Sequence, residues 1–248
     1  MLKGKTVLIT GANGGVGISI AELFLKNNAN LILIYNKNRN KLDELKKKFP
    51  KKKSYIHTYK INLLNSKNLK NTLIKINQKY TVNAFIHCVS LPVVNKRILD
   101  NTWNDYQKNN NLQTKSFFEI LKIIIPSMKQ NKQGKIVTIL SSYVIGKPPA
   151  GISSYLLGKY SLLGLSKSLA VELGMFNINV NCISPTMTET PLINKLPSKL
   201  KEIHVSQVPL GRLASTKDTA SVALFLCSNL SNYQSGENIL VSGGQTMH

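Results

Sequence analysis

A regular alternation of short apolar runs with amphipathic segments is the feature of this sequence that most constrains its fold. The apolar runs are rich in isoleucine and valine, and their lengths suit strands that are buried on both faces. They cover residues 6–10, 31–35, 55–61, 84–89, 136–140, 178–183 and 238–241. Segments with a 3.6-residue period separate them, at residues 16–27, 41–49, 68–78, 103–128, 155–173 and 219–226. This order predicts an α/β fold in which helices cover both faces of a doubly wound parallel sheet.

The 248 residues are expected to form a single domain, 1–248, since no Pro/Gly/Ser-rich linker or low-complexity block divides them. Residues 186–210 break the rhythm with three prolines and a short amphipathic piece. A segment just beyond the carboxyl end of a strand is where a substrate lid would lie in such a fold. An ordinary long connection is the alternative interpretation.

The composition favours a cytoplasmic protein. No run of 18 apolar residues occurs, so no membrane span is expected. The opening residues MLKGKTVLIT enter a strand-like run at once and lack the order of a secretory signal. The three cysteines, Cys88, Cys182 and Cys227, lie in apolar segments without metal-ligand spacing. They are predicted to be reduced, buried thiols, and no metal site is expected.

A formal net charge of +22 would suit a nucleic-acid partner. Nearly all of this charge is lysine, however, and arginine occurs only at Arg39, Arg97 and Arg212. Arginine is the side chain that forks onto phosphates and base edges, so its scarcity argues against specific nucleic-acid binding. The densest run, Lys46 to Lys53, is expected to be a solvated face.

A glycine cluster lies between the first apolar run and the first amphipathic segment. Glycines at this point let the backbone turn sharply and bring its amide groups, with the positive end of a helix, against a pyrophosphate. The position after the first strand therefore predicts nucleotide binding. The loop residues expected to contact the cofactor are Gly11, Asn13, Gly14, Gly15, Val16 and Gly17.

The loop spacing T-G-x-x-x-G-x-G differs from the ordinary Rossmann pattern G-x-G-x-x-G, and here the chain resembles the short-chain dehydrogenase/reductase family. The resemblance implies a Rossmann-type fold and covers essentially the whole chain. The family pattern places a serine thirteen residues before a tyrosine and a lysine four residues after it. Ser142, Tyr155 and Lys159 meet both spacings, and Asn111 occupies the place of the asparagine that completes the tetrad.

These residue types suit the reduction of a ketone. An oxygen that gains negative charge as the ketone accepts a hydride needs a proton donor and a second hydrogen bond. Tyr155 would be the donor, and Ser142 would hold the oxygen. The i, i+4 spacing puts Tyr155 and Lys159 on one helical face, so the lysine charge is expected to lower the pKa of the tyrosine. The resemblance further implies that Lys159 binds the nicotinamide ribose and that Asn111 holds a water that resupplies the proton.

An isolated Y-x-x-x-K pair has another interpretation, a tyrosine packed in a core helix and a lysine that reaches to water. The order of the glycine loop, the serine and the asparagine favours catalysis instead. Three neighbours of similar type, Ser141, Tyr143 and Tyr160, stand at the wrong spacing and are assigned packing or surface roles.

The residues after the second strand decide between NAD(H) and NADP(H). Lys37 and Arg39 lie there without an acidic residue before Asp43, so NADP(H) is favoured over NAD(H); two solvated cations are the alternative. The resemblance implies further cofactor contacts at Asn62, Leu63, Cys88, Pro185, Thr188 and Thr190.

Several positions depart from the family pattern, among them Asn62, which replaces the aspartate that commonly meets the adenine. The fourth strand ends in HCVS, at His87 to Ser90, where relatives commonly have NNAG. His87 is expected to be a buried, hydrogen-bonded structural histidine rather than a proton carrier. Thr186 follows Pro185 where glycine is usual.

The carboxyl-terminal segments QVPLGRLASTKDTASVALFLCSN and SGENILVSGG resemble those of bacterial 3-oxoacyl-(acyl-carrier-protein) reductases. The resemblance implies NADPH-dependent reduction of a small or acyl-carrier-linked ketone by a homotetramer. A dehydrogenase of a secondary alcohol or sugar, acting through the same residues, stays open as an alternative. So does a non-catalytic cofactor-binding protein on the same scaffold.

Overall fold

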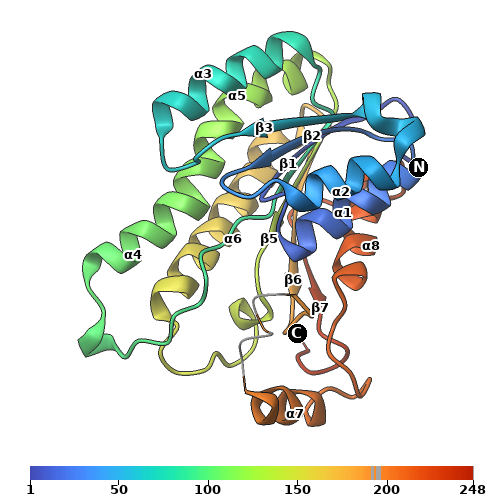
Figure 1. Ribbon diagram of the computed structural model, residues 1–248. Helices are drawn as coiled ribbons and strands as arrows, with labels where there is room; N and C mark the ends of the chain where they lie inside the picture. Colours follow the sequence, from blue (N-terminus) through green and yellow to red (C-terminus); the bar gives the residue numbers. More distant parts are fainter. Residues whose placement is uncertain (191–192, 194–196, 248) are drawn as a thin grey trace.

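The computed structural model describes residues 1–190, 193 and 197–247, which form one parallel sheet between two layers of helices (Figure 1). The strands are β1 (Thr6–Thr10), β2 (Asn30–Tyr35), β3 (Ile56–Lys60), β4 (Ala84–His87), β5 (Gly134–Ile139), β6 (Ile178–Pro185) and β7 (Asn238–Val241). Their order across the sheet is β3-β2-β1-β4-β5-β6-β7, and every neighbouring pair is parallel. The predicted doubly wound α/β fold is confirmed.

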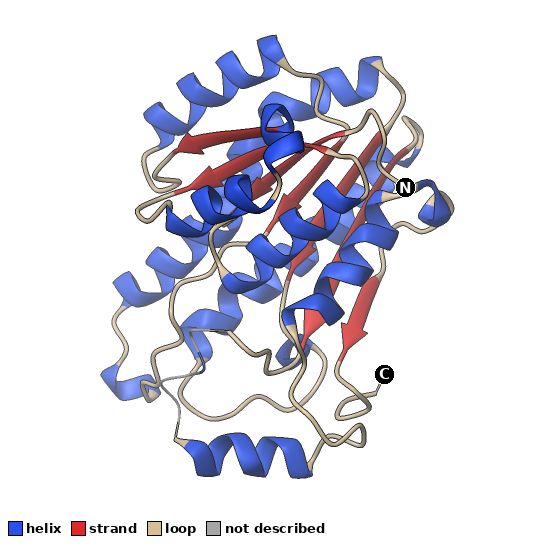
Figure 2. Cartoon of the chain, turned by 45° about the vertical axis from the view of Figure 1, so that its right-hand side comes forward, coloured by secondary structure: helices blue, strands red, loops and turns tan. Residues whose placement is uncertain are grey.

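Helices cover both faces of this sheet (Figure 2). One layer consists of α1 (Gly15–Lys26), α2 (Asn40–Lys48) and α8 (Thr216–Cys227). The opposite layer consists of α3 (Ser66–Lys79), α5 (Ser116–Gln130) and α6 (Ser153–Gly174), with α4 (Trp103–Asn110) packed on α6. A further helix, α7 (Ser198–Ser206), lies apart from both layers, at the bottom of the view in Figure 1.

The strands are apolar throughout because both faces of the sheet are buried. Successive side chains of a strand point to opposite faces. Leu8 packs in the core beneath α3, α5 and α6, while Val7 and Ile9 pack in the core beneath α1, α2 and α8. All three side chains are fully buried. Continuous apolar runs, rather than alternating ones, are the pattern expected for such strands.

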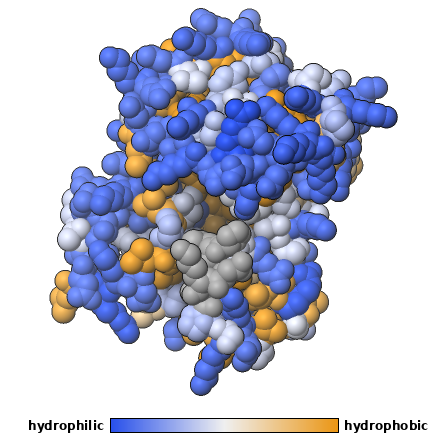
Figure 3. All heavy atoms as spheres, in the orientation of Figure 1, coloured by the Kyte–Doolittle hydropathy of each residue, from blue (hydrophilic) through white to orange (hydrophobic). Residues whose placement is uncertain are grey.

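Parallel pairing brings the carboxyl ends of the strands to one edge of the sheet. Thr10, the last residue of β1, pairs with Ile34 of β2 on one side and with His87 of β4 on the other. The strand order runs outward in opposite directions from this point, so the crevice above β1 and β4 is the topological switch point where ligands bind in open α/β sheets. The space-filling view shows a hollow in this part of the molecule, partly lined by hydrophobic side chains (Figure 3).

The sequence prediction of one helix over residues 103–128 needs correction. In the structure α4 is followed by a π-helical turn, η3 (Asn111–Lys115), and then by α5. A π turn keeps the chain helical and adds one residue, which changes the mean hydrophobic period of so long a segment too little to reveal it. Such turns occur frequently at functional sites.

The lid predicted over residues 186–210 contains α7, which the sequence showed only as a short amphipathic piece. Residues 191–192 and 194–196 of the predicted lid lie outside the described residues. Cys88, Cys182 and Cys227 are free thiols, as predicted; Cys182 and Cys227 are buried, and Cys88 is partly buried. No helix in the described part of the chain is long and apolar enough to cross a membrane.

Candidate active site

The glycine loop joins β1 to α1 at the switch point. Gly11 has a φ of +66°, and a Cβ atom added to it would lie 2.1 Å from the carbonyl oxygen of Cys88. A Cβ atom on Gly17 would lie 2.3 Å from the carbonyl oxygen of Gly11. Only glycine fits at either position. The loop therefore packs directly on the end of β4 and on the first turn of α1.

The beginning of α1 fits a pyrophosphate. Gly14 is the N-cap residue of α1, so no side chain caps the first amide groups of the helix. The first turn holds no acidic residue. The amide groups of this turn, at Gly15, Val16 and Gly17, therefore carry the positive end of the helix dipole without internal compensation. A dinucleotide phosphate is the type of ligand that such a loop and helix end accept.

The segment after β2 lies beside the glycine loop. The side chain of Asn13 donates to the carbonyl oxygen of Asn38 at 2.9 Å, which joins the two segments. Lys37 is exposed, and the part of the chain that is described gives it no ion pair. Arg39, in contrast, pairs with Asp43 at 2.9 Å. Of the two cations that the sequence proposed for a 2′-phosphate, Lys37 is thus the uncompensated one.

The predicted contacts after β3 and β4 lie at the same edge. Asn62 is exposed, and its side-chain oxygen accepts from the backbone amide of Leu64 at 3.1 Å. Leu63 is buried in the core, so its backbone rather than its side chain is available to a ligand. Burial raises the pKa of the Cys88 thiol to about 11, which keeps it neutral.

Ser142, Tyr155 and Lys159 come from β5 and α6. Ser142 follows β5, is 3% exposed, and begins the short helix η4 (Ser142–Val144), which packs against α6. Tyr155 lies in the first turn of α6 and is partly exposed. Lys159 is 2% exposed; its Nζ donates to the carbonyl oxygen of Ile139 at 2.8 Å and lies 5.6 Å from the centroid of the Tyr155 ring. The structure thus brings these three predicted residues to one region.

The pKa of Tyr155 does not shift in the direction that the sequence suggested. Burial raises it to about 12, and a hydrogen bond with Ser141 opposes that rise. The cost of burying a charged phenolate therefore outweighs any help from the neighbouring lysine. Burial also lowers the pKa of Lys159, to about 8.

Ser141, which the spacing assigned to a packing or surface role, is buried at the end of β5. Its hydroxyl accepts from the backbone amide of Tyr143 at 3.3 Å and opposes the rise of the Tyr155 pKa. Ser142, the next residue, is also buried. The sequence feature that could have indicated this contact is the pair of adjacent serines, since successive side chains at the end of a strand point to opposite sides.

Asn111 is exposed at the start of η3. Asn109 and Gln113, two positions before and after it, are buried and face α6. Residues two apart on a helix point to different sides, so Asn111 does not share the buried side of these two neighbours. The role that the resemblance implies for Asn111 stays a prediction.

His87 is fully buried at the end of β4, as predicted for a structural histidine. Its Nε2 donates to the carbonyl oxygen of Gln113 at 2.9 Å, because a carbonyl can only accept. Its Nδ1 then accepts from the hydroxyl of Thr10 at 3.0 Å. Burial lowers the pKa of His87 to about 3, with a small contribution from the charge of Lys159. The imidazole is therefore neutral and holds β1, β4 and η3 together.

The region after β6 is held by hydrogen bonds to the end of the chain. Thr186 shares its hydroxyl with Nε2 of His204 on α7 and with the side-chain oxygen of Gln245. The hydroxyl of Thr188 donates to the backbone of Thr186 at 2.8 Å. These contacts fix α7 beside the carboxyl edge. They also occupy the Thr188 hydroxyl that the sequence proposed as a cofactor contact.

The other two predicted cofactor contacts of this region, Pro185 and Thr190, are partly exposed. Pro185 ends β6. The backbone carbonyl of Thr190 accepts from the amide of Ile193 at 3.0 Å. The Thr190 side chain thus stays available for a ligand at this edge.

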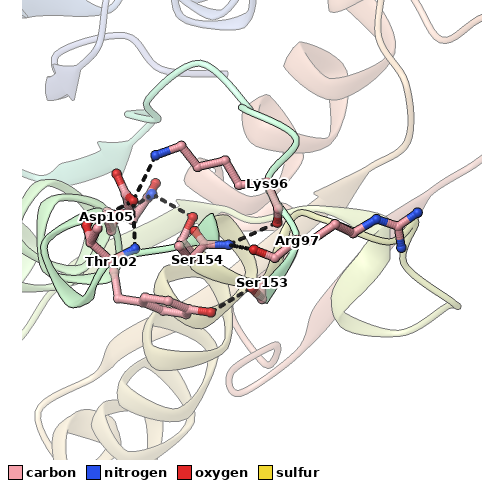
Figure 4. Close-up of polar contacts among 9 residues, drawn as sticks. Lys96, Arg97, Thr102, Asp105, Ser153 and Ser154 are labelled. Atoms are coloured by element: carbon pink, nitrogen blue, oxygen red, sulfur yellow. Dashed lines mark hydrogen bonds and ion pairs between the residues drawn. The ribbon is translucent and has the colours of Figure 1, made fainter. Parts of the chain in front are cut away.

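A polar network joins the segment before α4 to the first turn of α6 (Figure 4). Asp105 accepts from Lys96 and from the backbone and hydroxyl of Thr102, each at 3.0 Å. These contacts lower the pKa of the Asp105 carboxyl to about 2. On the α6 side, Ser153 bonds the hydroxyl of Tyr106 at 2.7 Å. The network fixes the turn of α6 that carries Tyr155.

Comparison with known proteins agrees with this geometry. Residues 11–246 match the family described as enoyl-(acyl carrier protein) reductase. The chain is 32% identical to the 3-oxoacyl-(acyl-carrier-protein) reductase FabG of Thermotoga maritima, covering 98% of both chains. It is 34% identical to the FabG reductase of Rickettsia felis, covering 99% of this chain and 98% of the relative.

Solved structures have the same fold. A levodione reductase structure has a TM-score of 0.91 at 21% identity and covers 99% of this chain and 98% of its own. A short-chain dehydrogenase/reductase of Mycobacterium ulcerans has a TM-score of 0.90, also at 21% identity, over 98% of this chain and 90% of its own. The chain therefore belongs to the short-chain dehydrogenase/reductase family of nicotinamide-dependent oxidoreductases.

The neutral, buried state of His87 predicts a pH dependence of stability. Since its pKa is about 3 in the folded protein and about 6.5 when unfolded, only the unfolded chain takes up this proton below about pH 6.5. Stability contributed by His87 is present above about pH 6.5 and is lost as the pH falls toward about 3. Between about pH 6.5 and pH 5, wild type should lose about 2 kcal/mol more than His87→Asn.

Urea unfolding of both proteins at the two pH values measures this difference. Asparagine keeps a donor at this position but does not titrate. His57→Asn is the matched control, because His57 is less buried and its pKa is also lowered. Equal losses in wild type and His87→Asn would show that His87 is not a buried neutral group.

Proposed function

We propose that this protein is an NADPH-dependent reductase of 3-oxoacyl thioesters, most specifically those carried on acyl carrier protein. The observation that supports this most is the position of Tyr155: it is partly exposed in the first turn of α6, beside Lys159 and the short helix that holds Ser142. The names of the FabG relatives, which match over nearly the whole chain, give the substrate class.

In this proposal each residue acts at one atom of the ketone. When bound, the reduced nicotinamide supplies a hydride to the carbonyl carbon. The Tyr155 hydroxyl gives its proton to the carbonyl oxygen as charge develops there, and the Ser142 hydroxyl donates a second hydrogen bond to it. Ser141 opposes the rise of the Tyr155 pKa that burial causes. Lys159 is held by Ile139 and contributes positive charge next to the resulting phenolate.

Reduction of a ketone fits these residues better than reduction of a carbon–carbon double bond, the reaction named in the description of the matching family. During reduction of a ketone, negative charge develops on the carbonyl oxygen, which becomes the product hydroxyl. Two hydrogen-bond donors directed at this oxygen stabilise the charge. Ser142 and Tyr155, on packed neighbouring elements, supply two such hydroxyls. Oxidation of a secondary alcohol or sugar uses the same groups in reverse, so substrate tests must include both.

The proton donor gives the first prediction of this proposal. Tyr155→Phe keeps the ring and removes the hydroxyl, so kcat for NADPH oxidation with a short 3-oxoacyl thioester should fall by about 10²- to 10⁴-fold. Cofactor binding should change little. Tyr160→Phe, an exposed tyrosine on the same helix, is the control and should keep wild-type turnover.

The same assay tests the substrate class. Faster turnover when the acyl group is attached to acyl carrier protein would support the carrier-linked substrate, for which the cationic surface offers electrostatic steering. Turnover only with sugars or simple alcohols would favour the dehydrogenase alternative. Cofactor binding without any turnover would favour a non-catalytic protein. Near-normal activity of Tyr155→Phe would exclude both enzyme interpretations.

The cofactor preference gives a second prediction. Because Lys37 lacks an acidic partner while Arg39 is paired with Asp43, Lys37→Ala should raise the KM for NADPH roughly tenfold and leave the KM for NADH nearly unchanged. Asp43→Asn frees Arg39 and should lower the KM for NADPH. Lys122→Ala, which removes an exposed charge on α5, is the control. Parallel changes for NADPH and NADH would argue against a 2′-phosphate at Lys37.

We also propose a homotetramer, as the family resemblance implies. Large apolar side chains are exposed on α5 and α6: Phe118, Leu157, Tyr160, Val171 and Met175. Val171 is 85% exposed, so contact with a second copy would bury most of its side chain. Sedimentation velocity at micromolar concentration should show a tetramer for wild type and a smaller species for Val171→Asp. A wild-type monomer would contradict the proposal.

A further inference from the structure

One side of α4 and η3 faces the first two turns of α6, the part of α6 that carries Tyr155. Tyr106 bonds Ser153 at 2.7 Å, and the side chain of Asn109 donates to Ser154 at 3.5 Å. Gln113 follows four residues later on the same side. Its side chain reaches Gly158 so closely that a Cβ atom there would lie 2.7 Å from Nε2 of Gln113.

Gln113 is the deepest member of this row, and its carboxamide is incompletely bonded. The side chain is fully buried. Its Nε2 group has Asn109 as a distant acceptor at 3.4 Å, while Oε1 is buried without a hydrogen-bond partner among the described residues. A buried polar atom without a partner is destabilising, so such atoms are rare and call for an explanation.

Lys159 offers the matching donor. It follows Gly158, the residue against which Gln113 packs, and both residues of α6 are buried. A lysine ammonium carries three N–H donors, and within the described residues Lys159 uses one, toward Ile139. His87 lies next to both partners: it bonds the backbone of Gln113, and the charge of Lys159 affects its pKa.

We propose that Gln113 is a positioning residue of the reductase site, and that its side-chain oxygen accepts a hydrogen bond from a water molecule that bridges it to the Lys159 ammonium. This inference rests on the proposed function. Gln113 would hold the lysine charge beside Tyr155 without contacting the substrate. Gln113 is buried, whereas Asn111, the residue that the sequence proposed, is exposed.

The charge on Lys159 is the quantity that Gln113 should control. The titratable groups that face Lys159 are Tyr155 on α6, and His87 and Cys88 at the end of β4. Burial keeps His87 and Cys88 neutral, since the pKa of His87 is about 3 and that of Cys88 about 11. With no carboxylate among these neighbours, a neutral acceptor is what stabilises the ammonium against its burial.

Two substitutions of Gln113 should move the pH dependence of kcat in opposite directions. Gln113→Met keeps the shape and removes the acceptor, so kcat should fall at least about tenfold, with KM for the ketone changed less than about threefold, and the alkaline limb should move about one pH unit lower. Gln113→Glu places a negative acceptor there, and the alkaline limb should move to higher pH. Gln107→Met, the same change at an exposed glutamine of α4, is the matched control and should leave both quantities unchanged.

NMR titration of ¹³C-labelled lysine gives a second readout that needs no turnover, with the Lys159 signal assigned by its loss in Lys159→Met. The pKa of Lys159 should be lower in Gln113→Met and higher in Gln113→Glu. If Gln113→Met does not fold, as judged by thermal melting, the upward shift in Gln113→Glu carries the test.

The outcomes separate the two proposals. The role of Gln113 would be overturned if neither Gln113 variant shifts the alkaline limb of kcat and the pKa of Lys159, or if both variants shift them equally. This holds even if the wild-type enzyme is active. A loss of turnover in Gln107→Met as large as in Gln113→Met would also overturn it. A wild-type protein without reductase activity, but with opposite shifts of the Lys159 pKa, would reject the proposed reaction and keep the contact.

Discussion

Parallel pairing of the whole sheet is the constraint on which the rest of this structure depends. It places the ends of β1, β4, β5 and β6 at one edge, so that residues far apart in the chain share one crevice. The close approach of Gly11 to the carbonyl oxygen of Cys88 seals β1 against β4 there. The hydrogen bond from Lys159 to Ile139 ties α6 to the end of β5. Tyr155 is thereby fixed relative to the serines that follow β5.

Burial sets the electrostatics of this crevice. It keeps His87 neutral, so that the imidazole works as a link between β1, β4 and η3. It also raises the pKa of Tyr155 from 10.0 to about 12 and lowers that of Lys159 from 10.5 to about 8, which moves the two pKa values apart. A proton donor and a charge that supports its conjugate base are most effective when their pKa values approach the working pH. Of the two groups, only Lys159 has a pKa near neutral pH in the protein without cofactor, at about 8.

The fold was predictable from the sequence because strands buried on both faces leave continuous apolar runs, and the glycine loop was predictable because Gly11 and Gly17 leave no room for a side chain. The π turn at Asn111 was not, because one inserted residue changes the mean hydrophobic period of a long helical segment too little to be noticed. The hydrogen bond of Ser141 and the ion pair of Arg39 depend on side-chain direction, which spacing along the chain does not fix.

The central claim is that Tyr155 and Ser142 hold one oxygen of the substrate. A crystal structure with NADP⁺ and a short 3-hydroxyacyl thioester tests it most directly. The account predicts the 3-hydroxyl oxygen within about 2.6–3.2 Å of both side-chain hydroxyls, with the carbon that bears it facing the nicotinamide. A hydroxyl bound away from Tyr155, or a cofactor bound elsewhere than above β1 and β4, would contradict it.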